Sequence, residues 1–167
     1  VMDMTTAFEF SEDYGDPNAA IWVYNAAASP FPKPADYDGP EGYFEYLTTV
    51  GPDPEGIQHG QEFHYRTPNS DVLGWIISRV SGMEVTELLS DRIWSRMGAE
   101  QDAYMTVDGV GTPFAGGGLS AGLRDLGRFG QIMLNGGAWH GEQIVPVAAI
   151  ESIRGGGLRD LRDRAIL

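Results

Sequence analysis

The sequence predicts a mainly α-helical chain with few strands, and three observations lead to this prediction. Apolar residues recur three and four positions apart in several segments between residues 69 and 154, which is the spacing of helices with one buried face. Alternating patterns typical of strands are rare and short, and the best example is "DAYMTVDG". Hydrophobic residues make up 42% of the 167 residues, so the chain is long and apolar enough to build a core.

The clearest helical segment runs from Asn69 to Ser81. Asn69 or Ser70 can cap its start, with Pro68 just outside. Gly82 can stop its end. Its apolar residues follow helical spacing and are expected to form one buried face: Val72, Leu73, Ile76, Ile77 and Val80.

Further helices are expected after this one. The segment "EVTELLSDRIWSRMG" repeats apolar residues at helical spacing and is expected to end at Gly98. The segment after Gly122 is expected to be helical, with Ser120 as its cap and Asp125 in its first turn, where the helix dipole favours a carboxylate. A last helix is expected to begin near Pro146.

Residues 1–60 are expected to be largely irregular. "SEDYGDPN" combines Asp, Gly and Pro in a turn, and the prolines of "ASPFPKPADYDGPEG" exclude a helix or a central strand. A short helix is expected within "EGYFEYLTTV". Long irregular segments of compact domains are often lids or binding loops. We therefore expect one domain in three parts: a loop-rich substrate-side segment at 1–60, a helical lobe at 61–154, and a tail of uncertain structure at 155–167.

The charge balance excludes some classes of partner. The chain carries 24 acidic and 11 basic residues, and a formal net charge of −13 would repel the phosphates of nucleic acids and of anionic membranes. It has no cysteine, which excludes disulfides and a cysteine nucleophile. We expect no nucleic-acid partner, no membrane partner and no cofactor.

Neither the histidines nor the acidic residues predict a metal site. His59, His64 and His140 lack the spacing of metal ligands and are expected at the surface or behind a site. One acidic cluster does not have the spacing of an EF-hand loop, so a solvated surface is expected. Its members are Asp13, Asp16, Asp36, Asp38 and Glu41.

"GLSAG", residues 118–122, matches the G-x-S-x-G pattern of a nucleophile elbow, with Ser120 as the candidate nucleophile. "TPFAGG" precedes it instead of a buried strand, and the only downstream histidine, His140, follows too closely for an acid-bearing strand to intervene. A helix cap is therefore the favoured interpretation of Ser120. The three glycines before it, Gly116, Gly117 and Gly118, can form an anion cradle or allow close backbone packing, and the sequence leaves both open.

Tyr65 raises a different possibility, because it stands in a polar turn immediately before a helix. A tyrosine acts as a general base only when nearby cations lower its pKa, and a serine–lysine pair is a suitable partner. The only lysine in the chain, Lys33, lies among prolines, and S-x-x-K occurs nowhere in the sequence. By chemistry alone, Tyr65 is more simply interpreted as a packing residue.

"FHYRTPNSDVLGWIISRVSG", residues 63–82, resembles the segment around the catalytic tyrosine of the serine β-lactamase-like hydrolases. This superfamily includes class C β-lactamases, DD-peptidases, related esterases and 6-aminohexanoate-dimer hydrolases. Tyr65 and residues 72–74 keep the family spacing, while Thr67 replaces an asparagine that in the family helps to position the substrate and the lysine.

Other stretches are most similar to the 6-aminohexanoate-dimer hydrolase branch, and the resemblance covers nearly all of residues 1–157. They are "DMTTAFEFSEDYGDP", "YRTPNSDVLGW", "AEQDAYMTVDGVGTPFAGGGLSAGLRDLGRFGQIMLNGG" and "IVPVAAIESIRGG". The resemblance implies an α+β fold, of which this piece is mainly α. It matches the helical lobe and active-site loops of the β-lactamase/transpeptidase-like fold, with most of the antiparallel sheet missing.

The resemblance also implies roles for individual residues. Tyr65 falls on the catalytic tyrosine, and Tyr14 on a tyrosine whose loop closes over the substrate. Asn25, which is expected to line the loop after Tyr14, and Gly116 fall on substrate-facing positions. Three residues are expected to hold the turn of Tyr65 by hydrogen bonds: Arg66, Thr67 and Asn69.

We therefore expect an internal fragment of a serine hydrolase that acts on small-molecule amides or carboxylic esters through an acyl-serine intermediate. The family's Ser-x-x-Lys is expected upstream of Val1 and its third motif downstream of Leu167, so the chain alone is expected to be inactive. The alternative is a non-catalytic binding or scaffold protein that keeps the helical lobe. An independent hydrolase that uses Ser120 is the least favoured interpretation. The sequence does not predict the oligomeric state.

Overall fold

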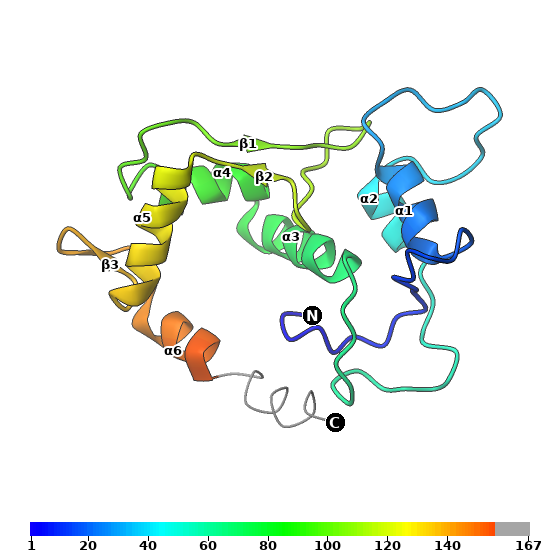
Figure 1. The fold of residues 1–167 in the computed structure, drawn as a ribbon, viewed down its shortest axis with the longest axis horizontal. Coiled ribbons are helices and arrows are strands. Elements are labelled where there is room, and N and C mark those ends of the chain that lie inside the picture. Colours follow the sequence, from blue (N-terminus) through cyan, green and yellow to red (C-terminus); the bar gives the residue numbers. More distant parts are fainter. Residues whose placement is uncertain (156–167) are drawn as a thin grey trace. The chain divides into compact units, whose positions relative to one another are not determined.

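The computed structural model describes residues 1–155, and helices dominate this part of the chain (Figure 1). The helices are α1 (Ala20–Ala28), α2 (Tyr43–Leu47), α3 (Pro68–Ser81), α4 (Val85–Leu89), the π-helical turn η1 (Ser90–Trp94), α5 (Leu123–Leu134) and α6 (Val147–Gly155). Each described strand is two residues long, and the strands form two pairs. The prediction of a mainly helical chain with few strands is confirmed.

The strand pairs are local structures. β1 (Tyr104–Met105) pairs with β2 (Leu119–Ser120), and β3 (Ala138–Trp139) pairs with β4 (Glu142–Gln143). The second pair is antiparallel, with Ala138 opposite Gln143. The turn between β3 and β4 is tight, because His140 and Gly141 both have positive φ angles, of 47° and 85°.

The residues divide into two compact units. The first comprises Val1–Val85 and Met105–Leu119, and the second comprises Thr86–Tyr104 and the described residues from Ser120 onward. The segment 105–119 therefore belongs to the same unit as the loop-rich N-terminal residues. Residues 156–167, which hold nearly all of the expected tail, lie outside the described residues.

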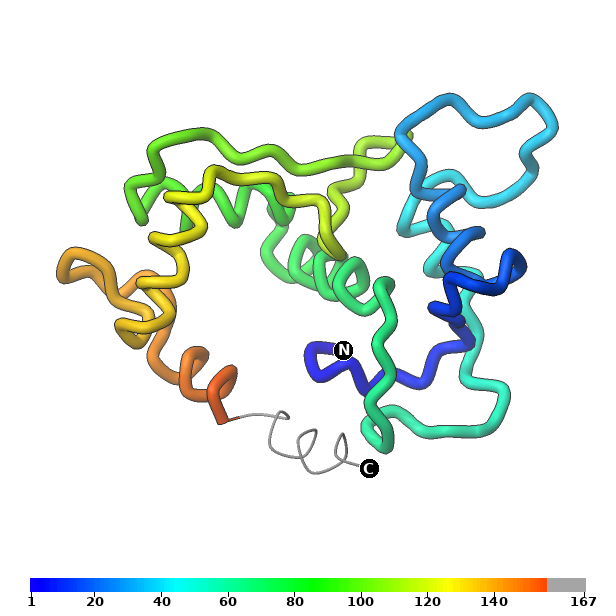
Figure 2. Tube along the Cα trace, viewed as in Figure 1, coloured from blue at the N-terminus to red at the C-terminus, as the bar shows by residue number. Residues whose placement is uncertain are grey.

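The core of the first unit is aromatic and lies around α1 and α2. Phe10, Tyr24, Tyr43 and Tyr46 are its buried aromatic residues. The ring of Tyr24 contacts that of Tyr46 edge-on, with centroids 5.0 Å apart. Residues 1–60 are thus less irregular than expected: the helix in "EGYFEYLTTV" is present as α2, but α1 was missed. Figure 2 shows the chain running from the N-terminus through α1 and α2 into α3.

The α3 helix buries a different face from the one predicted. Its buried residues are Pro68, Asn69, Asp71 and Gly74. Ile76 and Val80 of the expected apolar face are 46% and 83% exposed, so that part of the prediction is wrong. The physical reason is that α3 contacts its neighbours through the hydrogen bonds of Asp71, the close backbone approach at Gly74 and the ring of Trp75, which stacks on Phe44 of α2. None of these residues belongs to the predicted apolar face.

The ends of α3 were predicted in part. The helix begins at Pro68, and the residue before it, Thr67, makes no side-chain cap hydrogen bond. Neither Asn69 nor Ser70 is the cap, because both lie inside the first turn. Gly82 ends the helix in the left-handed conformation, with a φ of 70°, as predicted.

The proline-rich loop contains Lys33, whose ammonium group caps the end of α1. Nζ of Lys33 donates to the carbonyl oxygens of Ala26, Ala27 and Ser29. A cation at this end of a helix is favoured by the helix dipole. Since three carbonyl oxygens hold its ammonium group, Lys33 has a structural role at this position.

The second unit has its own small core, formed by Met97, Ile132 and Ile144. Asp125, at the start of α5, accepts the backbone amides of Glu100 and Gln101. The pKa of Asp125 is held below its usual value chiefly by the hydrogen bond from the Glu100 amide. The neighbouring Arg128 and the Gln101 amide add to this effect.

Other boundaries of the second unit can be compared with the sequence predictions. Gly122 precedes α5 and no side chain caps that helix, so the prediction that Ser120 caps it is wrong. The helix expected near Pro146 is present as α6. None of the described helices is long and apolar enough to cross a membrane.

Candidate active site

Tyr65 lies in the irregular segment that leads into α3, and its side chain is 57% exposed. The amide of His64 donates to the carbonyl of Met4 at 2.9 Å, which ties this segment to the N-terminal residues. Among the residues that the structure describes, the Tyr65 hydroxyl has no hydrogen-bond partner. The backbone beside Tyr65 is therefore held in place, while its hydroxyl is free to contact a substrate or a further segment of protein.

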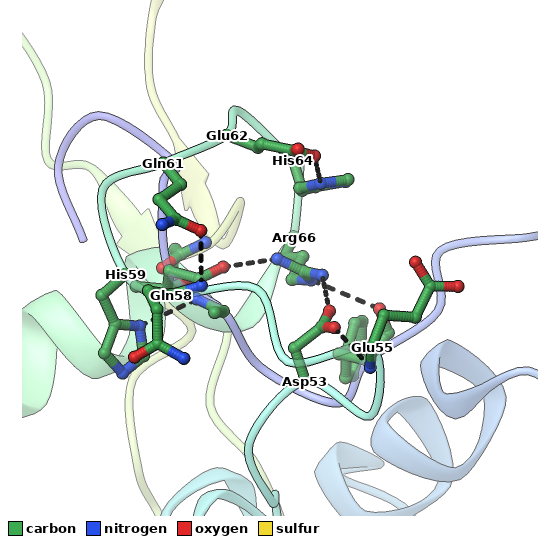
Figure 3. A network of polar contacts seen from close by, with 12 residues as sticks. Asp53, Glu55, Gln58, His59, Gln61, Glu62, His64 and Arg66 are labelled. Carbon is green, nitrogen blue, oxygen red and sulfur yellow. Dashed lines mark hydrogen bonds and ion pairs between the residues drawn. The ribbon is translucent and has the colours of Figure 1, made fainter.

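Arg66, the residue after Tyr65, anchors this segment (Figure 3). Its buried guanidinium group donates to the carbonyl oxygens of Thr6 and Phe10 and lies 3.4 Å from a carboxylate oxygen of Asp53. A buried arginine is tolerated when such partners satisfy its donors. Because these contacts fix Arg66, they also fix the backbone of Tyr65 beside it.

Figure 3 also shows the loop that surrounds this anchor. The amide of Glu55 donates to Asp53 at 2.9 Å, so the acid that pairs with Arg66 also shapes its own turn. Nδ1 of His59 accepts the amide of Ala7 at 2.8 Å. His59 is thus part of the scaffold that supports the N-terminal strand-like segment.

Glu12 joins Tyr14 to the turn that follows Tyr65. The Tyr14 hydroxyl donates to Oε2 of Glu12 at 2.8 Å, and Oε1 of Glu12 accepts the backbone amide of Thr67. The hydrogen bond to Glu12 raises the pKa of Tyr14, and the neighbouring Tyr65 adds to this effect. Two exposed tyrosines that are far apart in sequence are therefore close together at one turn.

Asn69 holds the N-terminal segment against the first turn of α3. Its Oδ1 accepts a hydrogen bond from the Thr6 hydroxyl at 2.7 Å, and the side chain is 1% exposed. Within residues 1–155, its Nδ2 is a buried donor with no partner. Arg66, Thr67 and Asn69 thus each bind N-terminal residues.

Gly116 lies beside this turn because of Asp71. The amide of Gly116 donates to Oδ1 of Asp71 at 3.1 Å, and the hydroxyl of Tyr24 donates to Oδ2. A Cβ atom on Gly116 would lie 3.2 Å from Cγ2 of Thr67 and 2.6 Å from Cε2 of Phe114. The position is therefore filled by its neighbours, and glycine is the residue that fits.

The run Gly116–Gly118 is closely packed backbone, which decides between the two sequence interpretations. The amide of Gly116 is taken by Asp71, and that of Gly118 donates to the carbonyl of Phe114 at 2.8 Å. A Cβ atom on Gly118 would lie 2.6 Å from that same carbonyl oxygen. Two of the three amides that an anion cradle would use are therefore already bonded within the protein.

Asn25 occupies a different local structure from the one expected. It lies on the exposed side of α1, not in a loop, because α1 begins only a few residues after the Tyr14 turn. Trp22 of the same helix contacts the ring of Tyr14, with centroids 5.9 Å apart, and donates from Nε1 to the carbonyl of Asp16. This helix therefore supports the Tyr14 turn directly.

The structure does not assemble the alternative sites that the sequence raised. Ser120 is exposed in β2, and within the described residues its hydroxyl has no histidine partner. His140 lies in the β3–β4 turn, with its ring against Trp139. No group of three or more acidic, histidine or cysteine side chains in residues 1–155 is arranged to hold a metal ion.

Three residues of this site escaped the sequence interpretation. Glu12 was overlooked because it sits in a turn rich in acids, and its only signal is its position two residues before Tyr14. Asp71 resembles an ordinary first-turn acid of a helix. Tyr24 lies in a segment where no helix was expected.

Comparison with known proteins gives the class of fold. The chain matches the family described as Beta-lactamase over residues 22–159. A solved structure named "Putative 6-aminohexanoate-dimer hydrolase from Bacillus anthracis" superposes with a TM-score of 0.79 at 32% identity, over 93% of this chain and 40% of that one. Another, named "Crystal structure of putative beta-lactamase from Bacteroides dorei DSM 17855", gives a TM-score of 0.56 at 19% identity over 77% of this chain and 39% of that one, which shows the fold alone.

The sequence relationship is similar. The chain is 38% identical over 160 residues to the 6-aminohexanoate-dimer hydrolase of Paenarthrobacter ureafaciens, which is 96% of this chain and 39% of that protein. The fold is thus the α+β fold of the β-lactamase-like proteins, represented here by a mainly helical part. The chain belongs to the beta-lactamase family. It spans about two fifths of the length of these 6-aminohexanoate-dimer hydrolase relatives.

Proposed function

We propose that the complete protein containing this chain is a serine hydrolase that cleaves amide or carboxylic-ester bonds through an acyl-serine intermediate. Membership of the beta-lactamase family and the similarity to a 6-aminohexanoate-dimer hydrolase support the proposal. The observation that carries it is the meeting of two exposed tyrosines at one turn. Glu12 joins Tyr14 to Thr67, and Tyr65 precedes Thr67 by two residues.

In this proposal Tyr65 moves a proton between the serine nucleophile and the leaving group. Its hydroxyl is exposed, while Arg66 beside it is fixed by buried hydrogen bonds. This combination suits a group that must meet a reacting atom within a few tenths of an ångström. General acid–base assistance of this kind is worth about 10²–10⁴-fold in rate.

Tyr14, Asn25 and Gly116 form the substrate side of the proposed site. Tyr14 is 59% exposed and lies in a turn that can close over a bound substrate. Asn25 is exposed on the helix that supports this turn. Gly116 has no side chain, so in this proposal the substrate contacts only its backbone.

The nucleophile and its activating cation must come from outside this sequence, because S-x-x-K is absent from it. A tyrosine accepts a proton readily only with a cation beside it. Arg66 is committed to Thr6, Phe10 and Asp53, and Lys33 is committed to the end of α1. The proposal therefore assigns the cation to a lysine of the missing Ser-x-x-Lys and the oxyanion hole to the same remainder.

The proposed substrates are small amides and carboxylic esters. The test is to express the complete gene product and, separately, residues 1–167. Both are assayed on a linear 6-aminohexanoate dimer, p-nitrophenyl acetate and nitrocefin. We expect the complete product to hydrolyse the amide or the acetate and to be acylated at one serine by a fluorophosphonate probe, and residues 1–167 to do neither.

Two outcomes would contradict the proposal. A complete gene product that carries no Ser-x-x-Lys and shows no turnover would favour the non-catalytic binding or scaffold protein. Turnover by residues 1–167 that disappears in Ser120→Ala would move the nucleophile into this chain. Nitrocefin turnover much faster than amide and ester turnover would instead assign the substrate class to β-lactams.

A further inference from the structure

The buried face of α3 holds a carboxylate that the proposed chemistry does not use. Asp71 is 1% exposed, and no arginine, lysine or histidine within residues 1–155 forms an ion pair with it. An unpaired buried carboxylate is costly because it loses its hydration. In compensation, its oxygens accept hydrogen bonds from two donors, one in each of two other segments.

The first donor is Tyr24, a fully buried tyrosine of α1. The other is the backbone amide of Gly116, which lies 3.1 Å from Oδ1. The amide of the preceding Ala115 donates instead to the carbonyl oxygen of Pro113. Asp71 thus joins three segments that are distant in sequence: the helix after the Tyr14 turn, the helix after Tyr65, and the turn of Gly116.

The contact between α3 and the 115–116 turn is close as well as polar. Gly74 lies one helical turn after Asp71, and a Cβ atom on it would approach Cβ of Ala115 to 2.9 Å. Asp71 and Gly74 therefore accommodate the 115–116 turn together. Asp71 accepts its hydrogen bond, and Gly74 leaves room for it because it has no side chain. At the other side of this turn, a Cβ atom on Gly116 would be 3.2 Å from Thr67, two residues from Tyr65.

We propose that Asp71 is a positioning residue: together with Tyr24 it fixes the Ala115–Gly116 turn against the Tyr65 end of α3, and so sets the backbone wall that substrate meets. The inference rests on the proposed hydrolase function. It assigns to Asp71 and Tyr24 no contact with the reacting atoms.

The arrangement depends on the charge of Asp71. An ionised carboxylate accepts both donors through charge-assisted hydrogen bonds, whereas a protonated one has an O–H of its own and loses acceptor capacity. The groups that face it are Tyr24 of α1, Tyr43 of α2 and Asp108 of the neighbouring loop. Burial raises the pKa of Asp71 to about 6, so this change falls within an accessible pH range.

The test uses the complete gene product and two readouts between pH 4.5 and 8. One is KM and kcat for a short amide, and the other is hydrogen exchange of the Gly116 amide followed by ¹⁵N NMR. The variants are Asp71→Asn and Tyr24→Phe. Tyr46→Phe is the matched control, because Tyr46 packs on Tyr24 in the same core but donates to the carbonyl of Ala20 instead.

In the unmodified protein we expect KM to rise roughly tenfold as the pH falls through about 6, with kcat less affected, and exchange at Gly116 to accelerate over the same range. Asp71→Asn should remove this midpoint and keep KM at its high value throughout. Tyr24→Phe should move both midpoints upward, because it deletes a hydrogen bond that stabilises the carboxylate. Tyr46→Phe should leave both midpoints in place.

Other results would overturn the inference. If Asp71→Asn keeps both midpoints, or Tyr46→Phe shifts them as Tyr24→Phe does, Asp71 does not control the turn. If exchange at Gly116 accelerates while KM stays constant, the bond is structural only. A complete product without any hydrolase activity would instead remove the proposed function, and the positioning role with it, while the exchange profile would still report the bond to Gly116. Should Asp71→Asn not fold, the Tyr24→Phe and Tyr46→Phe pair decides.

Discussion

The carboxylate of Glu12 accepts the backbone amide of Thr67, 55 residues further along the chain. The amide lies just before α3, where carboxylates are favoured by the unpaired N–H groups and the dipole of a helix. The other oxygen of the same carboxylate holds Tyr14. One side chain thus orders the beginning of α3 and the exposed tyrosine beside it, and the first prediction follows from this double role.

Replacing Glu12 by alanine should release Tyr14 and raise KM for amide substrates of the complete gene product by up to about tenfold. Tyr14→Phe should produce part of the same effect, because it removes the hydroxyl and leaves the bond to Thr67 intact. The double variant should be no worse than Glu12→Ala, since both changes break one linkage. Steady-state kinetics on the two single variants and the double variant provide the measurement. Fully additive losses would mean that Glu12 and Tyr14 act separately.

Tyr65→Phe should lower kcat of the complete gene product by about 10²–10⁴-fold with little change in stability. Phenylalanine keeps the ring and loses only a hydroxyl that has no partner within residues 1–155, so packing should be preserved. The loss should be larger for amides, whose nitrogen must be protonated to leave, than for p-nitrophenyl esters. Assays on both substrates and a thermal melt provide the measurement. Near-normal amide turnover with a lowered Tm would assign Tyr65 to packing.

Asp71 should make the stability of the protein fall as the pH rises from about 4 to about 6. Its pKa is raised from an ordinary 3.8 to about 6 by burial, so the folded state favours the protonated form. Its stabilising contribution is full below the unfolded-state pKa and is lost as the pH rises through the folded-state pKa. A difference of about two pKa units corresponds to about 3 kcal/mol.

The measurement for this effect is urea unfolding at several pH values, for the unmodified protein and for Asp71→Asn. Other carboxylates titrate in both proteins, so the difference between the two curves isolates Asp71. Relative to Asp71→Asn, the unmodified protein should lose free energy of unfolding between pH 4 and pH 6. Above pH 6 the difference between the two proteins should stay constant. Parallel curves would show that Asp71 titrates alike in the folded and unfolded states.

Gly116→Ala should destabilise the protein by about 1–3 kcal/mol, because the added methyl group overlaps the ring of Phe114. That ring is stacked on Tyr43 at 5.2 Å and has little room to move. Phe114→Leu in the same chain should recover part of the loss. Gly127→Ala is the control: a Cβ atom there meets nothing within 4 Å, so the substitution should be neutral or stabilising. Equal stabilities for the two alanine variants would show that Gly116 is not crowded.

The sequence alone determined the helical character of this protein and some of its helix ends, namely the stop at Gly82 and the starts near Gly122 and Pro146. Periodic apolar residues with glycine stops predict α3, the segment of α4 and η1, α5 and α6, because these signals are local. The spacing of Tyr65 to residues 72–74, together with the other similar stretches, also indicates the family to which the chain belongs.

Only the tertiary structure decided which face of α3 is buried and which residues meet at the site. Apolar periodicity predicts burial of Ile76 and Val80, but the hydrogen bonds of Asp71 and the close approach at Gly74 turn the opposite, polar face inward. Glu12 and Thr67 meet across 55 residues, and no local pattern encodes such a contact. Hydrogen bonds between distant segments depend on how the whole chain folds, whereas helix propensity and helix ends depend on neighbouring residues.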